Sequence, residues 1–155
     1  MLNSKIFESK NQSHCSRMNI DKKKFSNLFN KIFYMKKEFP NQQAENDEGN
    51  REYKWKLLPR FYSNINLKEN KLASQMKYRL YEGNGKALYL IGVTDDGKSI
   101  GLPEDEIYSS LKFIRNVAKI IETNIDKIRL YNNKNSFYIA TIRLSNENIL
   151  QIKKY

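Results

Sequence analysis

The hydrophobic positions of residues 21–33 recur every three or four residues, which is the spacing of an amphipathic helix. They are Phe25, Leu28, Phe29, Ile32 and Phe33. Asp21 precedes them as a candidate N-cap, and lysines fill much of the rest of the segment. The pattern predicts a basic helix that could pack on its own domain, lie on a membrane or become ordered on meeting RNA.

Apolar runs separated by turn residues predict strands in the remainder of the chain. The expected strands are residues 52–58, 87–93, 127–131 and 136–144. The turn at Asp95, Asp96 and Gly97 is a hairpin signal, so residues 99–102 are expected to form a short returning strand.

Two helices are predicted between these strands. The first begins at Asn66, with Glu69 three residues later as in a capping box, and ends at Gly83. The second opens at Pro103 with three acidic residues in its first turn. The resulting order, β-α-β-β-α-β-β, predicts an α+β fold: a single small mixed sheet with two packed helices, plus the basic N-terminal helical extension.

A local change in charge suggests how the chain is divided. Residues 1–40 carry nine basic and three acidic side chains, whereas residues 41–50 contain three acidic residues and no basic one. Turn-forming residues dominate that short acidic stretch, as expected of an exposed linker. We predict a basic extension and linker over residues 1–46 and an α+β domain that binds RNA or the ribosome over residues 47–155.

The overall charge changes the functional expectation. Across 155 residues, 28 Lys and Arg stand against 17 Asp and Glu, which gives a net charge of +11. A folded chain so basic favours an acidic partner, and RNA is the commonest one. The single cysteine, Cys15, leaves no disulfide and no cysteine pair for zinc, so we expect a reducing, cytoplasmic setting. We also expect a monomer that has no cofactor, metal, membrane span or small-molecule substrate.

One motif suggests catalysis but has the wrong surroundings. Gly92, Gly97, Lys98 and Ser99 match the phosphate-binding pattern G-x-x-x-x-G-K-[ST] after an apolar strand. A true phosphate-binding loop continues directly into a helix, whose amides hold the phosphates. Here Gly101 and Pro103 follow at once, so we predict a hairpin turn and not an enzyme.

Interleaved cations and aromatic residues are the pattern expected of a nucleic-acid-binding surface. The candidate contacts are Arg60, Lys77, Tyr78, Arg79, Asn84 and Lys86, with Lys22, Lys23, Lys24, Lys36 and Lys37 of the extension as auxiliary contacts. We expect Arg60, Lys77, Arg79 and Lys86 to cluster near one loop. The alternative is that the aromatic rings are buried beside solvated charges.

Particular residues resemble a known family. They are residues 47–54, residues 75–85, and then Ala87, Tyr89, Ile91, Gly92, Val93, Asp95, Gly97, Gly101 and Leu102. Together they resemble the segment before the G domain in the GTPBP family of elongation-factor-like GTPases. The likeness covers residues 47–145, and the sequence ends about where that G domain would begin, so GTPase activity is not expected of it.

A free-standing module of this kind, rich in Asn, Lys and Ile, resembles the dormancy factors of microsporidia, which occupy ribosomes in resting spores. This resemblance implies a ribosome-bound inhibitor that fills a tRNA site such as the exit site. Two other functions stay open: a tRNA- or mRNA-binding module of RNA turnover, and nucleotide hydrolysis through residues 92–99.

Overall fold

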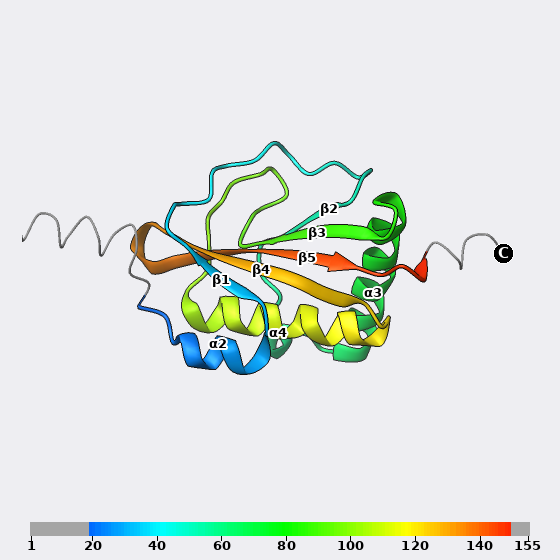
Figure 1. Ribbon diagram of the computed structural model, residues 1–155, viewed down its shortest axis with the longest axis horizontal. Coiled ribbons are helices and arrows are strands. Elements are labelled where there is room, and N and C mark those ends of the chain that lie inside the picture. Colours follow the sequence, from blue (N-terminus) through cyan, green and yellow to red (C-terminus); the bar gives the residue numbers. More distant parts are fainter. Residues whose placement is uncertain (1–18, 150–155) are drawn as a thin grey trace, which may run out of the picture.

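A computed structural model describes residues 19–149, in which one five-stranded mixed sheet is the central element (Figure 1). Its strands are β1 (Ile32–Met35), β2 (Arg51–Lys54), β3 (Lys86–Ile91), β4 (Asn124–Asn133) and β5 (Phe137–Ser145). Their spatial order is β1-β4-β5-β3-β2. The β1–β4 and β2–β3 pairs are parallel, whereas β5 runs antiparallel to both neighbours. The predicted α+β class with a single mixed sheet is therefore confirmed.

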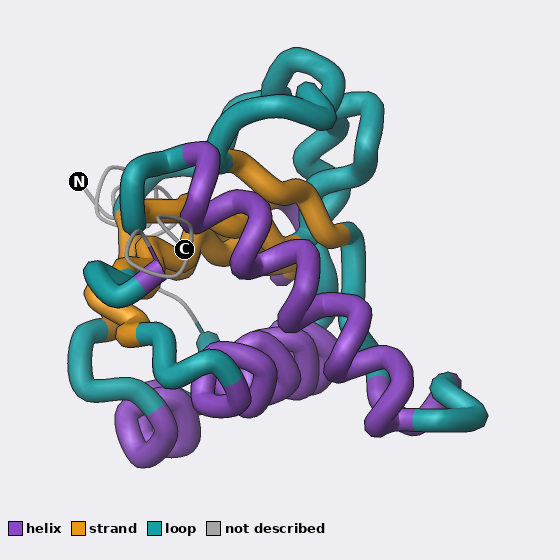
Figure 2. The backbone as a smooth tube through the Cα atoms, turned by 90° about the vertical axis from the view of Figure 1, so that its right-hand side faces the viewer, coloured by secondary structure: helices purple, strands orange, loops and turns teal. Residues whose placement is uncertain are grey.

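In the described part of the chain, three α-helices pack on one face of this sheet, while the long loops gather on the side away from α4 (Figure 2). They are α2 (Lys22–Leu28), α3 (Ile65–Glu82) and α4 (Glu104–Ile120). Short 3-10 turns occur at η1 (Pro59–Phe61) and η2 (Lys134–Ser136). Among residues 19–149, no helix combines the length and the apolar character needed to cross a membrane.

Local sequence explains where the helices begin and end. Asn64 caps α3 by accepting a hydrogen bond from the Leu67 amide at 3.1 Å, and Gly83 ends the helix. Helix α4 carries its three acidic residues in the first turn, where the helix dipole favours negative charge. Both helices thus lie close to their predicted positions.

Alternation along the strands builds the main core. On β3, Tyr89 and Ile91 face the helices and are fully buried. Met76 of α3 and Leu111 of α4 are equally buried and pack in the same cluster. A second, smaller cluster lies on the opposite face of the sheet, where Leu90 and the alternate residues of the other strands point.

The N-terminal segment differs from its prediction. Asp21 caps α2, since its carboxylate accepts from the Lys24 amide at 3.2 Å, but the helix ends at Leu28. The expected continuation to Phe33 is wrong: residues 32–35 form β1, whose ladder with β4 outweighs the helical spacing of the apolar residues. Of the three alternatives, the described part of the segment packs on its own domain, because Phe25 is fully buried in the main core.

One predicted strand is shorter than expected, and another is not formed. The first ends at Lys54, and the following Leu57 and Leu58 are buried in a loop, where the Leu57 amide donates to Ser110 Oγ at 3.0 Å. Residues 99–102 do not form a strand but make two isolated bridges, Val93 to Ser99 and Leu102 to Tyr138. Residues 57 and 58 are thus held by burial, and residues 99–102 by single bridges, without a continuous strand ladder.

The expected linker lies against the molecule along part of its length. The Gln42 amide donates to the Gly97 carbonyl and the Glu45 amide to the Asp95 carbonyl, both at 2.7 Å. Phe39 packs its ring 5.0 Å from that of Tyr131 on β4. Residues 39–45 therefore cover one end of the sheet face that the helices leave free (Figure 1). Cys15 and the rest of the predicted extension before residue 19 lie outside the described residues.

Candidate nucleic-acid interface

Arg79, a predicted contact, is not on the surface. It is only 3% exposed, and its guanidinium lies 3.5 Å from the buried carboxylate of Glu52. The same group donates to the Glu48 carbonyl at 3.2 Å and the Gly49 carbonyl at 2.9 Å. Arg79 thus anchors residues 48–52 to α3, and its inclusion among the exposed contacts was wrong.

The buried pair of Arg79 and Glu52 belongs to a larger polar group. Burial and the neighbouring Glu52 raise the pKa of Glu45 to about 7, and its carboxylate also accepts a short hydrogen bond from the Tyr53 amide. Burial raises the pKa of Tyr89 as well, and its hydroxyl has no hydrogen-bond partner among the described residues. This polar group holds the linker to the sheet. Because Arg79, Glu52 and Tyr89 are buried, their side chains do not contribute to a surface that an RNA strand could contact.

The last turns of α3 and the loop that follows present three of the predicted contacts. Tyr78 is 44% exposed, and its hydroxyl lies 2.9 Å from the Asp47 carbonyl. Asn84 adopts a left-handed conformation (φ 55°), which Asn tolerates better than most residues. Asn84 and Lys86 are both exposed, so this turn can meet a large partner.

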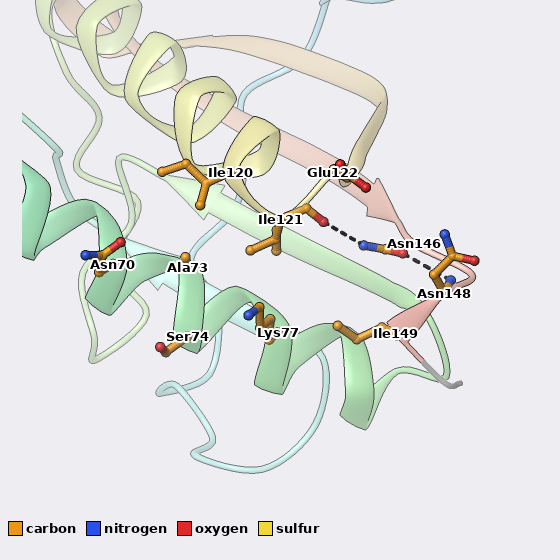
Figure 3. A pocket seen from close by; sticks show the side chains of 10 residues that line it. All are labelled: Asn70, Ala73, Ser74, Lys77, Ile120, Ile121, Glu122, Asn146, Asn148 and Ile149. Carbon is orange, nitrogen blue, oxygen red and sulfur yellow. Dashed lines mark hydrogen bonds between the residues drawn. The ribbon is translucent and has the colours of Figure 1, made fainter. Parts of the chain in front are cut away.

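Lys77 lies in a groove between α3, the C-terminal end of α4 and the end of β5 (Figure 3). The groove has a volume of about 470 Å³, and Ile120 and Ile121 form its α4 side. Asn146 is held there, because its amide donates to the Ile121 carbonyl at 3.0 Å and to Thr123 Oγ1 at 2.9 Å. Lys77 itself is exposed and faces solvent.

Arg60 lies far from this turn in the fold. It pairs with Glu106 in the first turn of α4 at 3.3 Å, and its guanidinium lies 5.0 Å from the ring centre of Phe61. The expected cluster of Arg60, Lys77, Arg79 and Lys86 is therefore not formed, because one member is buried and Arg60 is held at the α4 end. The neighbouring Glu104 accepts from the Asp21 amide at 2.9 Å, so these acids have partners within the fold.

The five lysines predicted as auxiliary contacts fall into two groups. On α2, Lys22 lies 5.0 Å from the ring centre of Tyr34, and Lys24 lies 4.1 Å from that of Tyr108. The remaining three, Lys23, Lys36 and Lys37, are exposed. Cation–π contacts thus hold Lys22 and Lys24 near aromatic rings of the protein, although Lys22 is as exposed as the other three lysines.

The loop at residues 92–99 is the predicted hairpin turn. Its amides donate within the protein: Thr94 to the Lys98 carbonyl at 3.0 Å, Gly97 to the Thr94 carbonyl at 2.9 Å, and Ser99 to Asn41 Oδ1 at 2.9 Å. No helix begins until Glu104. Three amides of the loop therefore donate within the protein, where a phosphate-binding loop would direct its amides at a nucleotide.

Four further cations on the strands were not singled out in the sequence. They are Arg51, Lys127, Arg129 and Arg143. The signal was present as strict alternation, since Lys127 and Arg129 flank Ile128, and Arg143 separates Ile142 from Leu144. Such alternation places cations on the sheet face opposite the apolar residues.

Comparison with known proteins gives one clear likeness. Over 91 residues, the sequence is 41% identical to GTP-binding protein 2 of mouse (Mus musculus) and equally to that of human (Homo sapiens). The chain is similar to one segment of those proteins. That segment is 58% of this chain but only 14% of each relative. The likeness supports the expected resemblance to the GTPBP family. No protein-family model and no solved structure matches the chain.

Proposed function

We propose that this protein binds RNA, and that its partner is the ribosome, where it fills a tRNA site and keeps the particle inactive. One observation carries the proposal: the sequence has a net charge of +11, and the cations of the described residues lie mostly on exposed or partly exposed side chains, in a fold without an evident catalytic group among those residues. When such a surface binds RNA, it releases the counterions of the phosphates, and this release makes binding more favourable.

Two sequence resemblances help to choose between the ribosome and free RNA as the partner. The resemblance to microsporidian dormancy factors favours the ribosome over free RNA, and the similarity to GTP-binding protein 2 is compatible with a module taken from a larger protein. A small body with exposed lysines on several sides suits a crevice walled by ribosomal RNA. The exit site is the tRNA site we favour, and the protein would then be cytoplasmic and ribosome-associated.

The test is sedimentation with purified ribosomes at physiological salt, with and without deacylated tRNA as a competitor. We expect the protein to move with monosomes, to lower the yield of translation in vitro, and to be displaced by the tRNA. A protein that stays at the top of the gradient would contradict the proposal.

A tRNA- or mRNA-binding module of RNA turnover is the second candidate, supported by the same exposed cations. It predicts that the protein binds free tRNA or mRNA as tightly as it binds ribosomes. Measuring the binding of free RNA in the absence of ribosomes therefore separates the two functions.

Nucleotide binding is the third candidate, because the relatives are named GTP-binding proteins. The geometry of residues 92–99 opposes it, because the carboxylate of Asp96 lies 3.7 Å from Lys98 Nζ. This carboxylate would repel a phosphate that approached the lysine. Titration with GTP or ATP is expected to show no saturable binding. Saturable binding that disappears in Lys98→Ala would support the enzyme instead.

A further inference from the structure

One part of the sheet face opposite the helices gathers cations from four strands. The register places Arg51 of β2 beside Leu88 of β3, Leu88 beside Arg143 of β5, and Arg143 beside Lys127 of β4. Paired residues on neighbouring strands point to the same side. With strands about 4.8 Å apart, this row extends about 14 Å across the sheet.

Two adjacent positions enlarge the row. Arg129 of β4 lies one position further on the same face and pairs with Phe33 of β1. In the opposite direction along the strands, Lys86 is the first residue of β3, two positions before Leu88, and pairs with Ser145. We call this surface the open face: it consists of Phe33, Arg51, Lys86, Leu88, Lys127, Arg129 and Arg143.

The open face is accessible within the described part of the chain. Arg51, Lys86 and Arg143 are exposed, and Leu88, Lys127 and Arg129 are partly exposed. The helices lie on the other side of the sheet, and the linker covers Tyr131 and Leu90, further along the strands. Leu88 packs against the smaller cluster, whereas the charged side chains of this area reach solvent.

Its charge is strongly unbalanced. Between described residues, none of the five cations forms an ion pair with an acidic side chain. The nearby acids are Asp126, which accepts from Ser145 Oγ at 2.9 Å, and Glu48, which shares a groove with Arg51. Such an excess fits a polyanion and repels other cations.

Phe33 adds a flat apolar surface beside the charges. The ring is 47% exposed, although it belongs to a strand, and Lys127 Nζ lies 4.9 Å from its centre. An exposed aromatic ring on a sheet, next to cations, is the arrangement by which proteins stack unpaired bases and hold the adjoining phosphates.

We propose that the open face binds an unpaired stretch of RNA, with Phe33 stacking on a base and Arg51, Lys127 and Arg143 meeting successive phosphates. This inference rests on the proposed RNA-binding function and assigns it to a surface other than the α3 turn. An RNA duplex would present its bases to each other and leave Phe33 without a partner. An acidic protein segment would not use the ring for stacking.

The test compares two triple variants of the full chain with the same change of charge. Arg51→Gln, Lys127→Gln and Arg143→Gln remove the row, whereas Lys71→Gln, Lys112→Gln and Lys119→Gln remove exposed lysines of α3 and α4. Binding to a 12-nucleotide unpaired RNA is measured by fluorescence anisotropy. We expect the first variant to lose about tenfold or more in affinity and the second to lose about threefold or less.

A single substitution tests the stacking contact separately. Phe33→Leu is expected to weaken binding to the unpaired RNA by about fivefold or more and to leave binding to a duplex of equal length unchanged. Thermal melting of each variant verifies that the fold is retained. Equal losses in both triple variants, or tighter binding of the duplex, would overturn the inference while leaving RNA binding intact. No binding of either RNA by the unchanged protein would instead contradict the proposed function.

Discussion

Arg79 shows how the role of a cation depends on the residues around it. Its guanidinium neutralises Glu52 and satisfies two backbone carbonyls inside the protein. Removing one partner of such a pair leaves a buried charge without compensation, which is far costlier than the loss of a surface contact. Two residues earlier on α3, Lys77 is exposed, so its removal leaves no buried charge without a partner.

We therefore predict that Arg79→Met lowers the free energy of unfolding by about 3–5 kcal/mol. The matched variant Lys77→Met, on the same helix, should change it by about 0.5 kcal/mol or less. Urea denaturation followed by circular dichroism measures both. Equal stability of the two variants would show that the buried pair contributes nothing.

The sequence could not distinguish these two residues. Lys77, Tyr78 and Arg79 are consecutive on a helix, and helical periodicity alone gives the angle between side chains but not which polar residue meets a buried carboxylate. Glu52 comes from a strand 27 positions earlier, so the pairing depends on tertiary structure. In contrast, the cations of β4 and β5 followed directly from alternation and could have been predicted.

At the scale of elements, the linker depends on the protonation of Glu45. Its pKa is raised from 4.5 to about 7 by burial and by Glu52, so the folded protein keeps a proton on Glu45 that the unfolded chain has already released. The stabilisation is complete below pH 4.5 and is lost as the pH rises through about 7. The attachment of residues 41–45 should therefore weaken over this range.

We predict that the free energy of unfolding of the natural protein, relative to that of Glu45→Gln, falls as the pH rises from 4.5 to about 7. The side-chain amide that this substitution introduces does not titrate, so the difference isolates the one group. Denaturation at several pH values measures it, and hydrogen exchange of the backbone amides of residues 42 and 45 reports the linker directly. A difference that stays constant with pH would show that Glu45 titrates as in the unfolded chain.

Prediction of elements succeeded where local signals were complete. Gly83 marks the end of α3 and the acidic first turn marks the start of α4, so both helices were found, although the cap of α3 is Asn64 and not the predicted Asn66. The segment 29–35 failed because its apolar residues satisfy both a helical spacing and a short strand, and only the presence of β4 decides between them. The two hydrogen bonds that hold the linker could not be predicted either, since their acceptors lie in a loop distant in sequence.

At the scale of the whole molecule, charge is spread over several sides while a bound RNA strand meets one. The open face holds five cations, whereas the net charge is +11. Each phosphate neutralised on a single strand contributes about −0.7 to the slope of log K against log salt concentration. A strand confined to the open face should therefore give a slope near about −3.5, and one that wraps the full charge would approach about −7.7.

This slope can be measured for the unchanged protein with the 12-nucleotide RNA between about 50 and 200 mM salt. The variant with Arg51→Gln, Lys127→Gln and Arg143→Gln should lower its magnitude by about 2, because three phosphates lose their partners. The variant with Lys71→Gln, Lys112→Gln and Lys119→Gln should leave it almost unchanged, since those lysines lie on the helices. A slope that falls equally in both variants would mean that the RNA has no preferred face.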